Sequence, residues 1–373
     1  MDGKAATSGV LYFILTSMII YSTLISLGIV AHITYKQRRS ASKASNFEIV
    51  IVSKADSRVK KSLLESVKYH VGRFGKVVVV VDEGAELIPY LRSIKGVKLV
   101  VVPSNYRRDL VGKGRALQYF VDCCVDSSKW YVFIDDDNLI IGDDFQHEIP
   151  EYERMGYVAA NGILVPRPGK STLAYVMDWI RFIDDLLIYR FFTGLLARPL
   201  LGLHGDLLIV KGFVLKEIGF GRRSLTEDFD FAAELVKRGY KTWQSNTKVS
   251  IKSPNSLKDL VLQRGRWFKG IISGIRHCPA GMKLVVVLRS FTFGVGFFIL
   301  AVILPILSQL GYTWFILPAL PGSLYYVGTY TYGAYKAKRI HLVLLAPIMG
   351  IIEAMSRLYG LLLVKDYVII DKN

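Results

Sequence analysis

Long apolar runs lie near both ends of the chain, and a central region alternates apolar and polar positions on a shorter scale. Residues 10–33 form one uncharged run. Residues 291–335 contain no Asp, Glu, Lys or Arg, enough for two spans of roughly 20 residues each, with a polar turn at residues 308–311. Residues 342–364 form a further run that only two charged residues interrupt. The pattern predicts about four transmembrane helices.

The central region alternates predicted strands and helices. Phe47–Val52 is a short apolar run that ends in a polar loop, and apolar residues then recur every four positions from Val59 to Val71, as on one buried helix face. Lys76–Val81 is almost entirely valine, which is typical of a strand buried on both faces. The alternation continues with a helix at 85–94, a strand at 98–102, a helix at 113–125 and a strand at 130–134. This order predicts an α/β fold with a mostly parallel sheet, in which ligands bind at the carboxyl ends of the strands.

Basic clusters beside the apolar runs predict how the chain crosses the membrane. Lys36–Arg39 follows the first run, Lys283 and Arg289 precede the second, and Lys336–Arg339 precedes the last. Basic residues stay on the cytoplasmic side, so we expect a multi-pass protein of the cell membrane whose central domain is cytoplasmic. The expected organisation is an N-terminal transmembrane helix with a basic linker (1–44), a cytoplasmic domain with interfacial helices (45–284) and C-terminal transmembrane helices (285–373).

Two charged apolar segments each have more than one interpretation. Residues 176–200 carry apolar side chains at helical spacing beside charged ones, which fits a helix in the membrane interface or an ordinary core helix. Glu353 and Arg357 lie four residues apart in the last apolar run. Charges inside a membrane often mark function, but mutual pairing is a sufficient explanation here.

Composition narrows the class of protein. Hydrophobic residues make up 51% of the chain, too many for an ordinary soluble enzyme, and the net charge is +17. With several membrane spans present, this charge favours anionic lipids and phosphorylated ligands over nucleic acid, and no nucleic-acid partner is expected. The cysteines (Cys123, Cys124 and Cys278) have neither disulfide-framework nor metal-site spacing.

Polar clusters follow two of the predicted strands. Asp135, Asp136 and Asp137 come directly after an apolar strand, and such a triplet suits a divalent cation shared with a diphosphate, although a solvated acidic turn is the alternative. Lys113 opens a predicted helix in Gly112–Arg115, where backbone N–H groups and a cation could bind phosphate. Asp82 ends the valine-rich strand and either binds a nucleotide or begins a turn.

Two further clusters lie nearer the C-terminal membrane segments. Thr226, Glu227 and Asp228 precede an apolar helix, where they either cap it or provide a general base in Asp228. The motif from Gln263 to Trp267 has Arg266 to hold a leaving diphosphate and Trp267 to stack on a sugar, or it marks a membrane interface.

With these clusters in this order, the chain resembles the membrane-integrated family 2 glycosyltransferases, which include cellulose, chitin and hyaluronan synthases. The resemblance covers residues 45–285 and implies a Rossmann-like GT-A fold. It implies donor binding by Asp82, Lys113, Asp135, Asp136 and Arg266. It assigns the metal, Mg²⁺ or Mn²⁺, to Asp137 and the catalytic base to Asp228. It implies acceptor binding by Gly205, Glu227, Gln263 and Trp267.

The chain departs from the polymer-exporting synthases in having few spans and no long gating segment after Trp267, and Glu83 follows Asp82 where many relatives have a second Asp. It is more similar to the egghead-type β-mannosyltransferases and their archaeal-like relatives. That resemblance implies an inverting, metal-dependent transfer of one β-linked mannose from GDP-mannose to a lipid-linked glycan ending in GlcNAc or Glc, as in N-glycan or glycolipid biosynthesis. Alternatives are a processive polysaccharide synthase, a polyprenyl-phosphate sugar synthase and a non-catalytic membrane carrier.

Overall fold

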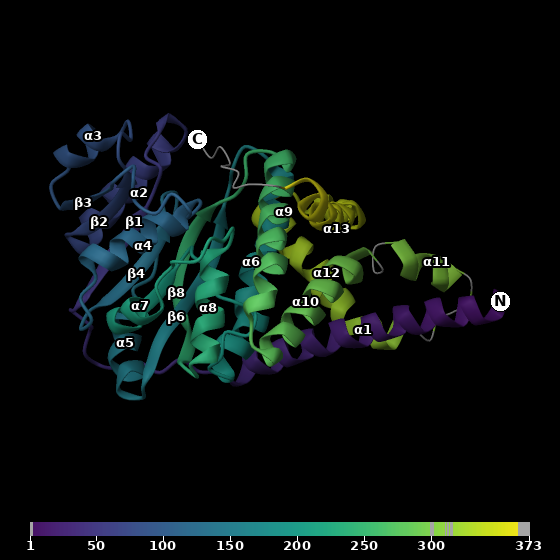
Figure 1. The fold of residues 1–373 in the computed structure, drawn as a ribbon. Coiled ribbons are helices and arrows are strands. Elements are labelled where there is room, and N and C mark those ends of the chain that lie inside the picture. Colours follow the sequence, from purple (N-terminus) through teal and green to yellow (C-terminus); the bar gives the residue numbers. More distant parts are fainter. Residues whose placement is uncertain (1–2, 299–301, 310, 312, 314–315, 365–373) are drawn as a thin grey trace.

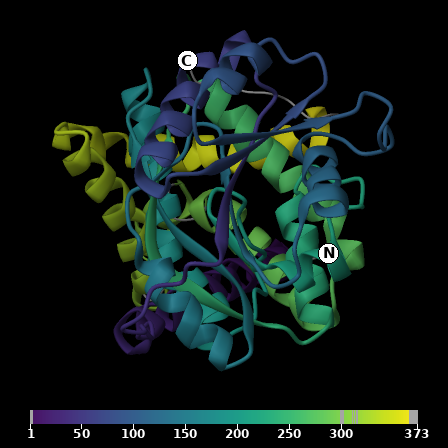
Figure 2. The ribbon, with the colours of Figure 1, turned by 90° about the vertical axis from the view of Figure 1, so that its left-hand side faces the viewer.

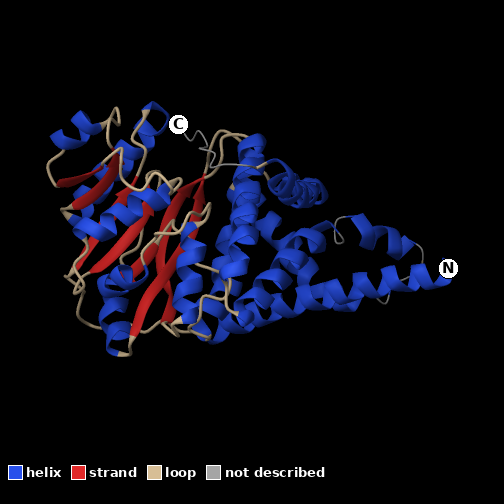
Figure 3. Cartoon of the chain, viewed as in Figure 1, coloured by secondary structure: helices blue, strands red, loops and turns tan. Residues whose placement is uncertain are grey.

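The computed structural model describes residues 3–298, 302–309, 311, 313 and 316–364. An eight-stranded sheet with its covering helices forms one end of the molecule, and long helices extend from it toward the N-terminus (Figures 1 and 3). Viewed from the sheet end, the N-terminus of the first helix therefore lies behind the sheet (Figure 2).

The sheet has the strand order β3-β2-β1-β4-β7-β6-β8-β5. Its strands are β1 (Phe47–Val52), β2 (Val77–Asp82), β3 (Val97–Val102), β4 (Trp130–Asp135), β5 (Leu139–Ile140), β6 (Tyr157–Arg167), β7 (Leu208–Lys211) and β8 (Lys241–Lys252). The first four strands pair in parallel, as do β6 and β8. Strand β7 is antiparallel to both β4 and β6, and β5 is antiparallel to β8. The predicted α/β fold is confirmed, although antiparallel strands enter after β4.

Helices cover both faces of the sheet. They are α2 (Lys60–Phe74), α3 (Ile88–Ser93), α4 (Lys113–Cys124), α5 (Asp144–Arg154), α7 (Gly212–Ile218) and α8 (Glu227–Lys237). Alternate residues of β1 show the division: Ile49 and Ile51 pack with α2, α3 and α5, and Val50 and Val52 pack with α4, α7 and α8. Since both faces are covered, β2 buries each of its valines, as its composition predicts.

A second core joins the sheet domain to the long helices. These helices are α1 (Gly3–Thr34), α6 (Thr172–Asp184), η2 (Asp185–Leu195), α9 (Leu257–Gly274), α10 (Ala280–Phe298), α11 (Leu304–Gln309), α12 (Ile316–Lys336), η6 (Ile340–Leu345) and α13 (Ala346–Leu363). Apolar side chains of α1, α6, η2, α12 and α13 make up most of this core. Most of the segment 176–200 forms a pair of helices, α6 and η2, whose apolar side chains pack into this core against the sheet and α1.

Two of the described helices are long and apolar enough to cross a membrane, Leu11–Thr34 and Ile340–Leu363. They match the first and last predicted spans. The expected pair within 291–335 falls partly on residues 299–301, 310, 312, 314 and 315, which lie outside the described residues. Helices α10, α11 and α12 occupy the described parts of this stretch.

Glycines allow two close helix crossings beneath the sheet domain. A Cβ added at Gly28 of α1 would lie 2.9 Å from Cβ of Leu187 in η2. A Cβ at Gly360 of α13 would lie 2.2 Å from the carbonyl oxygen of Gly265 in α9. The backbones of α9 and α13 thus approach closely because neither residue has a side chain, as at helix crossings in membranes. This crossing brings the last apolar helix to the functional site described next.

Candidate active site

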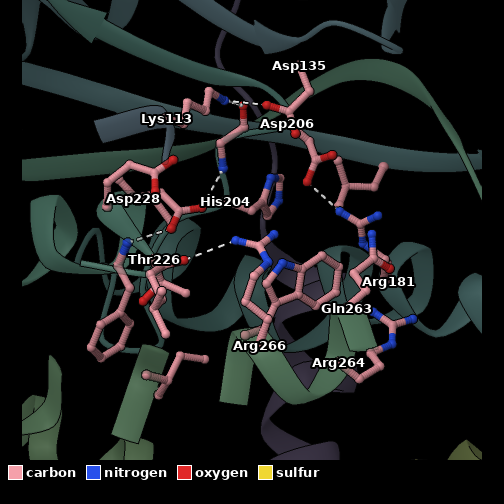
Figure 4. A pocket seen from close by; sticks show the side chains of 18 of the residues that line it. Lys113, Asp135, Arg181, His204, Asp206, Thr226, Asp228, Gln263, Arg264 and Arg266 are labelled. Atoms are coloured by element: carbon pink, nitrogen blue, oxygen red, sulfur yellow. Dashed lines mark hydrogen bonds and ion pairs between the residues drawn. The ribbon is translucent and has the colours of Figure 1, made fainter. Parts of the chain in front are cut away.

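One cavity of about 400 Å³ lies between the carboxyl ends of β1, β2 and β4 and the helices α6, η2, α8 and α9, with α10 and α13 at its far end. Figure 4 shows how the side chains converge on it. All the predicted site residues line this cavity: Asp82, Lys113, Asp135, Asp136, Asp137, Gly205, Glu227, Asp228, Gln263, Arg266 and Trp267. Their convergence is a property of the structure, and their individual roles stay predictions.

Lys113 and Asp135 form the polar centre of the sheet side of the cavity. Lys113 begins α4 directly after Gly112, whose φ of 59° favours glycine, and Asp135 ends β4. The Lys113 ammonium forms an ion pair with Asp135 and donates to the carbonyl of Gly205 at 3.3 Å. Burial by itself would lower the pKa of Lys113, but the carboxylates of Asp135 and Glu227 outweigh burial and raise that pKa. The side chain is therefore a fixed cation.

The rest of the acidic turn is held by neighbouring segments. Asp136 accepts a 2.6 Å hydrogen bond from Oγ of Ser53, which follows β1. Asp137 is 1% exposed, and Arg167 at the end of β6 donates a 2.7 Å hydrogen bond to its carbonyl oxygen. These contacts hold the carboxylate of Asp136 and the backbone of Asp137 in place at the end of β4.

Asp82 is the last residue of β2, which lies beside β1 in the sheet. Its carboxylate forms a 2.7 Å ion pair with Arg115 of α4, and its side chain is 40% exposed. The residue therefore sits at the open edge of the cavity, with one carboxylate oxygen already bound and the side chain accessible to solvent.

Glu227 and Asp228 open α8 close to the start of α4, where a Cβ at Gly114 would lie 3.6 Å from Cβ of Glu227. Oδ2 of Asp228 accepts a 2.7 Å hydrogen bond from the N–H of Gly205, and Oδ1 accepts one of 2.8 Å from the N–H of Phe229 (Figure 4). Burial raises the pKa of Asp228. Burial, followed by repulsion from Asp228, raises the pKa of Glu227 to about 7. Two close carboxylates in a buried site thus compete for protons, which is how proteins prepare a general base for neutral pH.

Thr226 does not cap α8 with its side chain, contrary to the capping interpretation. It occupies the N-cap position, but its hydroxyl makes no cap hydrogen bond and, within the described part of the chain, has no partner at all. A threonine whose hydroxyl capped the helix would bind a backbone N–H of the first turn. In this motif it is Asp228, and not Thr226, that binds a backbone N–H of the first turn.

The motif from Gln263 to Trp267 lies on α9 and faces the cavity. Arg266 donates a 3.1 Å hydrogen bond to the carbonyl of Leu225, next to Thr226. The Trp267 ring has two guanidinium groups near it, with Arg181 and Arg264 at 4.8 and 4.9 Å from its centroid. Cation–π contacts of this kind fix the ring orientation. The motif is therefore a wall of the site and not only a membrane-interface marker.

Sequence reasoning missed a buried polar network behind the acidic turn. Arg181 of α6 pairs with Asp206, which also accepts from Nδ2 of Asn138 at 3.2 Å. His204 lies 3.1 Å from Asp185, and attraction to this carboxylate outweighs burial and raises the pKa of His204. Asp206 is next to Gly205 in the chain, but its partner Arg181 is 25 residues away. No local sequence pattern predicts that these two residues pair.

The expected pairing of Glu353 with Arg357 needs correction, because Glu353 also reaches outside its own helix. The Glu353 carboxylate lies 3.5 Å from Nε of Arg264 on α9. Arg264 in turn binds Asp178 of α6 at 2.9 Å. Pairing within the last helix is thus not sufficient, and Glu353 connects α13 to the wall of the cavity.

Known proteins resemble this chain in sequence and in fold. The family described as Glycosyl transferase family group 2 matches residues 130–330. The beta-1,4-mannosyltransferase bre-3 of Caenorhabditis briggsae is 27% identical over 61% of this chain and 50% of its own length. The beta-1,4-mannosyltransferase egh of Drosophila melanogaster is 26% identical over 52% of this chain and 44% of its own length. The chain thus spans about half the length of the curated relatives it matches.

Among solved structures, the mannosyltransferase PcManGT from Pyrobaculum calidifontis, in complex with GDP-Man and Mn²⁺, has a TM-score of 0.53. Its identity is 13%, and the likeness covers 93% of this chain and 99% of that one. At this identity the likeness concerns the fold alone. The fold and the site together define a glycosyltransferase of the GT-A type. The chain belongs to glycosyl transferase family group 2.

Proposed function

We propose that this enzyme is a membrane-bound β-mannosyltransferase that moves one mannose from GDP-mannose to a lipid-linked glycan ending in GlcNAc or Glc. The sugar is supported by the names of the relatives, which are beta-1,4-mannosyltransferases. The observation that carries the chemistry is the position of Asp228, whose carboxylate is held by two backbone N–H groups, one of them from Gly205, which also binds Lys113.

The proposed reaction is a single displacement with inversion. Asp228 takes the proton of the acceptor hydroxyl while the hydroxyl oxygen bonds to C1 of mannose and the bond from C1 to the phosphate oxygen breaks. GDP leaves with that electron pair. Lys113 and Arg266 bind the negative charge that develops on the departing diphosphate. The pair Glu227–Asp228 retains enough basicity for this step because burial raises both pKa values.

A divalent cation fits the acidic turn. No group of three or more His, Cys, Asp or Glu side chains in the described segments gathers around one point as a metal site. Mg²⁺, however, commonly uses one or two carboxylates together with substrate phosphates, and the turn offers Asp137 and its neighbours in a fixed arrangement. When bound, such a cation neutralises charge on the diphosphate. We assign Asp137 as its first protein ligand.

The proposed membrane placement puts the catalytic domain in the cytoplasm, where nucleotide-sugars are made, with α1 and α13 as two of about four spans. Its support is the two apolar helices and the basic clusters beside the apolar runs. A cysteine introduced at position 338, labelled in intact cells with a membrane-impermeant reagent, tests this. Labelling only after permeabilisation is expected, and labelling of intact cells would place the site on the wrong side for its donor.

The experiment that tests the function is calorimetry followed by transfer. Purified enzyme should bind GDP-mannose more tightly than UDP-GlcNAc, and a chelator should weaken binding. Asp137→Ala should remove the chelator effect, whereas Asp143→Ala, whose side chain pairs with Lys43 at the surface, should not. Added GlcNAc-terminated lipid should then receive mannose. Tighter binding of UDP-GlcNAc than of GDP-mannose would contradict the proposed donor. If a chelator left the affinity of the wild-type enzyme for GDP-mannose unchanged, the proposed metal would be wrong.

A further inference from the structure

The end of the cavity farthest from the sheet is a polar chamber between helices, which we call the membrane-side lobe. It is lined by Gln263 of α9, Arg289 of α10, and Glu353 and Arg357 of α13. The lobe is continuous with the space around Asp228, since all these residues line the same cavity. None of the steps of sugar transfer proposed above uses Glu353.

The lobe contains buried acceptor oxygens that make no hydrogen bond. Within the described residues these are Oε1 of Gln263 and both carboxylate oxygens of Glu353, of which Oε1 also lies 3.5 Å from Nε of Arg264 in an ion pair. The hydroxyl of Thr226, at the junction with the catalytic end, is in the same condition. These side chains are 5%, 1% and 7% exposed, respectively. Buried polar atoms are rarely left unsatisfied, so each of these oxygens has room for a hydrogen bond from a ligand or a water molecule.

The charges of the lobe are already balanced. Arg264, which lies between α6 and α13, binds Asp178 at 2.9 Å, and Arg289 binds both oxygens of Asp184 at 2.8 and 2.9 Å. Glu353 and Arg357 add one charge of each sign. An ionised ligand would upset this balance in a site beside apolar helices, where an uncompensated charge is costly. The lobe therefore favours a neutral ligand that can donate hydrogen bonds.

We propose that the membrane-side lobe binds the neutral saccharide of the acceptor, next to its terminal sugar on the side of the lipid, and that Glu353 accepts a hydrogen bond from one of its hydroxyl groups. Sugar hydroxyls donate hydrogen bonds, which the carboxylate of Glu353 and the amide oxygen of Gln263 can accept. A phosphate has only acceptor oxygens at neutral pH and would meet the like charge of Glu353. The lobe thus selects acceptors whose lipid carries a hydroxyl-rich sugar, and not a phosphate, at this position.

This inference rests on the proposed function only in taking a glycan as acceptor, and its test needs no donor. The probes are octyl β-chitobioside and octyl phosphate, titrated into the full-length enzyme in lipid nanodiscs. Wild-type enzyme should bind the glycoside, and octyl phosphate should not displace it. Glu353→Ala should weaken glycoside binding about tenfold, or about 1.4 kcal/mol.

Two further variants separate recognition from folding. Glu353→Gln keeps the shape and one acceptor oxygen, so its loss should be smaller than that of Glu353→Ala. Asp178→Asn disturbs the other partner of Arg264 without changing the lining of the lobe, so glycoside affinity should stay close to wild type. Unchanged affinity in both Glu353 variants, equal loss in Asp178→Asn, or displacement by octyl phosphate would overturn the proposal. Failure of GDP-mannose to react would concern only the proposed function.

Discussion

The backbone of Gly205 joins the two charged sides of the site: its N–H donates to Asp228 at 2.7 Å, and its carbonyl accepts from Lys113 at 3.3 Å. A Cβ at this position would lie 3.2 Å from Nζ of Lys113 and 3.5 Å from Oδ2 of Asp228. The backbone of Gly205 is not among the left-handed glycines, so the requirement for glycine is one of space. An added side chain would make the Lys113 ammonium shift by a few tenths of an ångström, whereas the Asp228 carboxylate would be at ordinary contact distance.

We expect Gly205→Ala to lower kcat by about 10- to 100-fold, because small displacements of reacting groups are costly. Stability should change little, since the backbone conformation is accessible to alanine. Gly72→Ala is the matched control, because nothing lies within 4 Å of its added Cβ. Alanine in helix α2 should raise the free energy of unfolding by about 0.5–1 kcal/mol. Steady-state rates and thermal unfolding of both variants test this. Wild-type kcat in Gly205→Ala would remove the proposed link between Lys113 and Asp228.

Asp228→Asn should reduce kcat by about 10²- to 10⁴-fold, because an amide cannot take the acceptor proton. Affinity for GDP-mannose should stay within a few-fold of wild type. Asp230→Asn is a suitable control, since Asp230 is buried on the same helix but does not line the cavity. Single-turnover rates and calorimetry distinguish the two variants. Substantial turnover by Asp228→Asn would exclude the base role.

The first half of the fold was accessible from sequence because its signals are local. The strands from Phe47 to Asp135 and the helices between them follow apolar runs and helical spacing, and the structure has them within a few residues. Strands β6, β7 and β8 were not predicted. Their pairing brings together Tyr157–Arg167 and Lys241–Lys252, far apart in the chain, and no local pattern encodes that register.

The site shows the same division between local motifs and distant pairs. Clusters such as Asp135–Asp137 could be found because their residues are adjacent in sequence. The pairs Arg181–Asp206 and Asp185–His204 could not, because each joins a helix to a distant loop. The charged residues on 176–200 were visible in the sequence, but only the structure shows that Asp178 and Asp185 among them are buried.

The paired carboxylates predict a rise of activity with pH. Burial and the neighbouring Asp228 raise the pKa of Glu227 from 4.5 to about 7, and the two groups lose protons as a coupled pair. We expect kcat/KM to rise as pH passes through about 7. Glu227→Gln removes the negative charge beside Asp228, so Asp228 should lose its proton more easily. The rise in kcat/KM should then move to lower pH, whatever the absolute rate of the variant. A pH–rate profile of both enzymes tests this, and an unmoved limb would contradict the coupling.

The raised pKa of Glu227 also makes the stability of the folded protein depend on pH. Between pH 4.5 and about 7 the folded protein holds a proton on Glu227 that the unfolded chain has released. The free energy of unfolding should therefore fall as pH rises across this window. Glu227→Gln should make that part of the pH dependence flatter. Denaturant unfolding of detergent-solubilised protein at several pH values measures it, and an equal slope in the variant would exclude Glu227 as the cause.

The shape of the cavity predicts that transfer stops after one sugar. A growing polymer needs a continuous path between membrane helices by which to leave the site. Where α9 crosses α13, Gly265 and Gly360 bring the backbones together and leave no gap for a sugar chain. With excess GDP-mannose, a GlcNAc-terminated lipid should gain one hexose by mass spectrometry. The isolated product, returned as acceptor, should not react further. A ladder of added hexoses would favour a processive synthase.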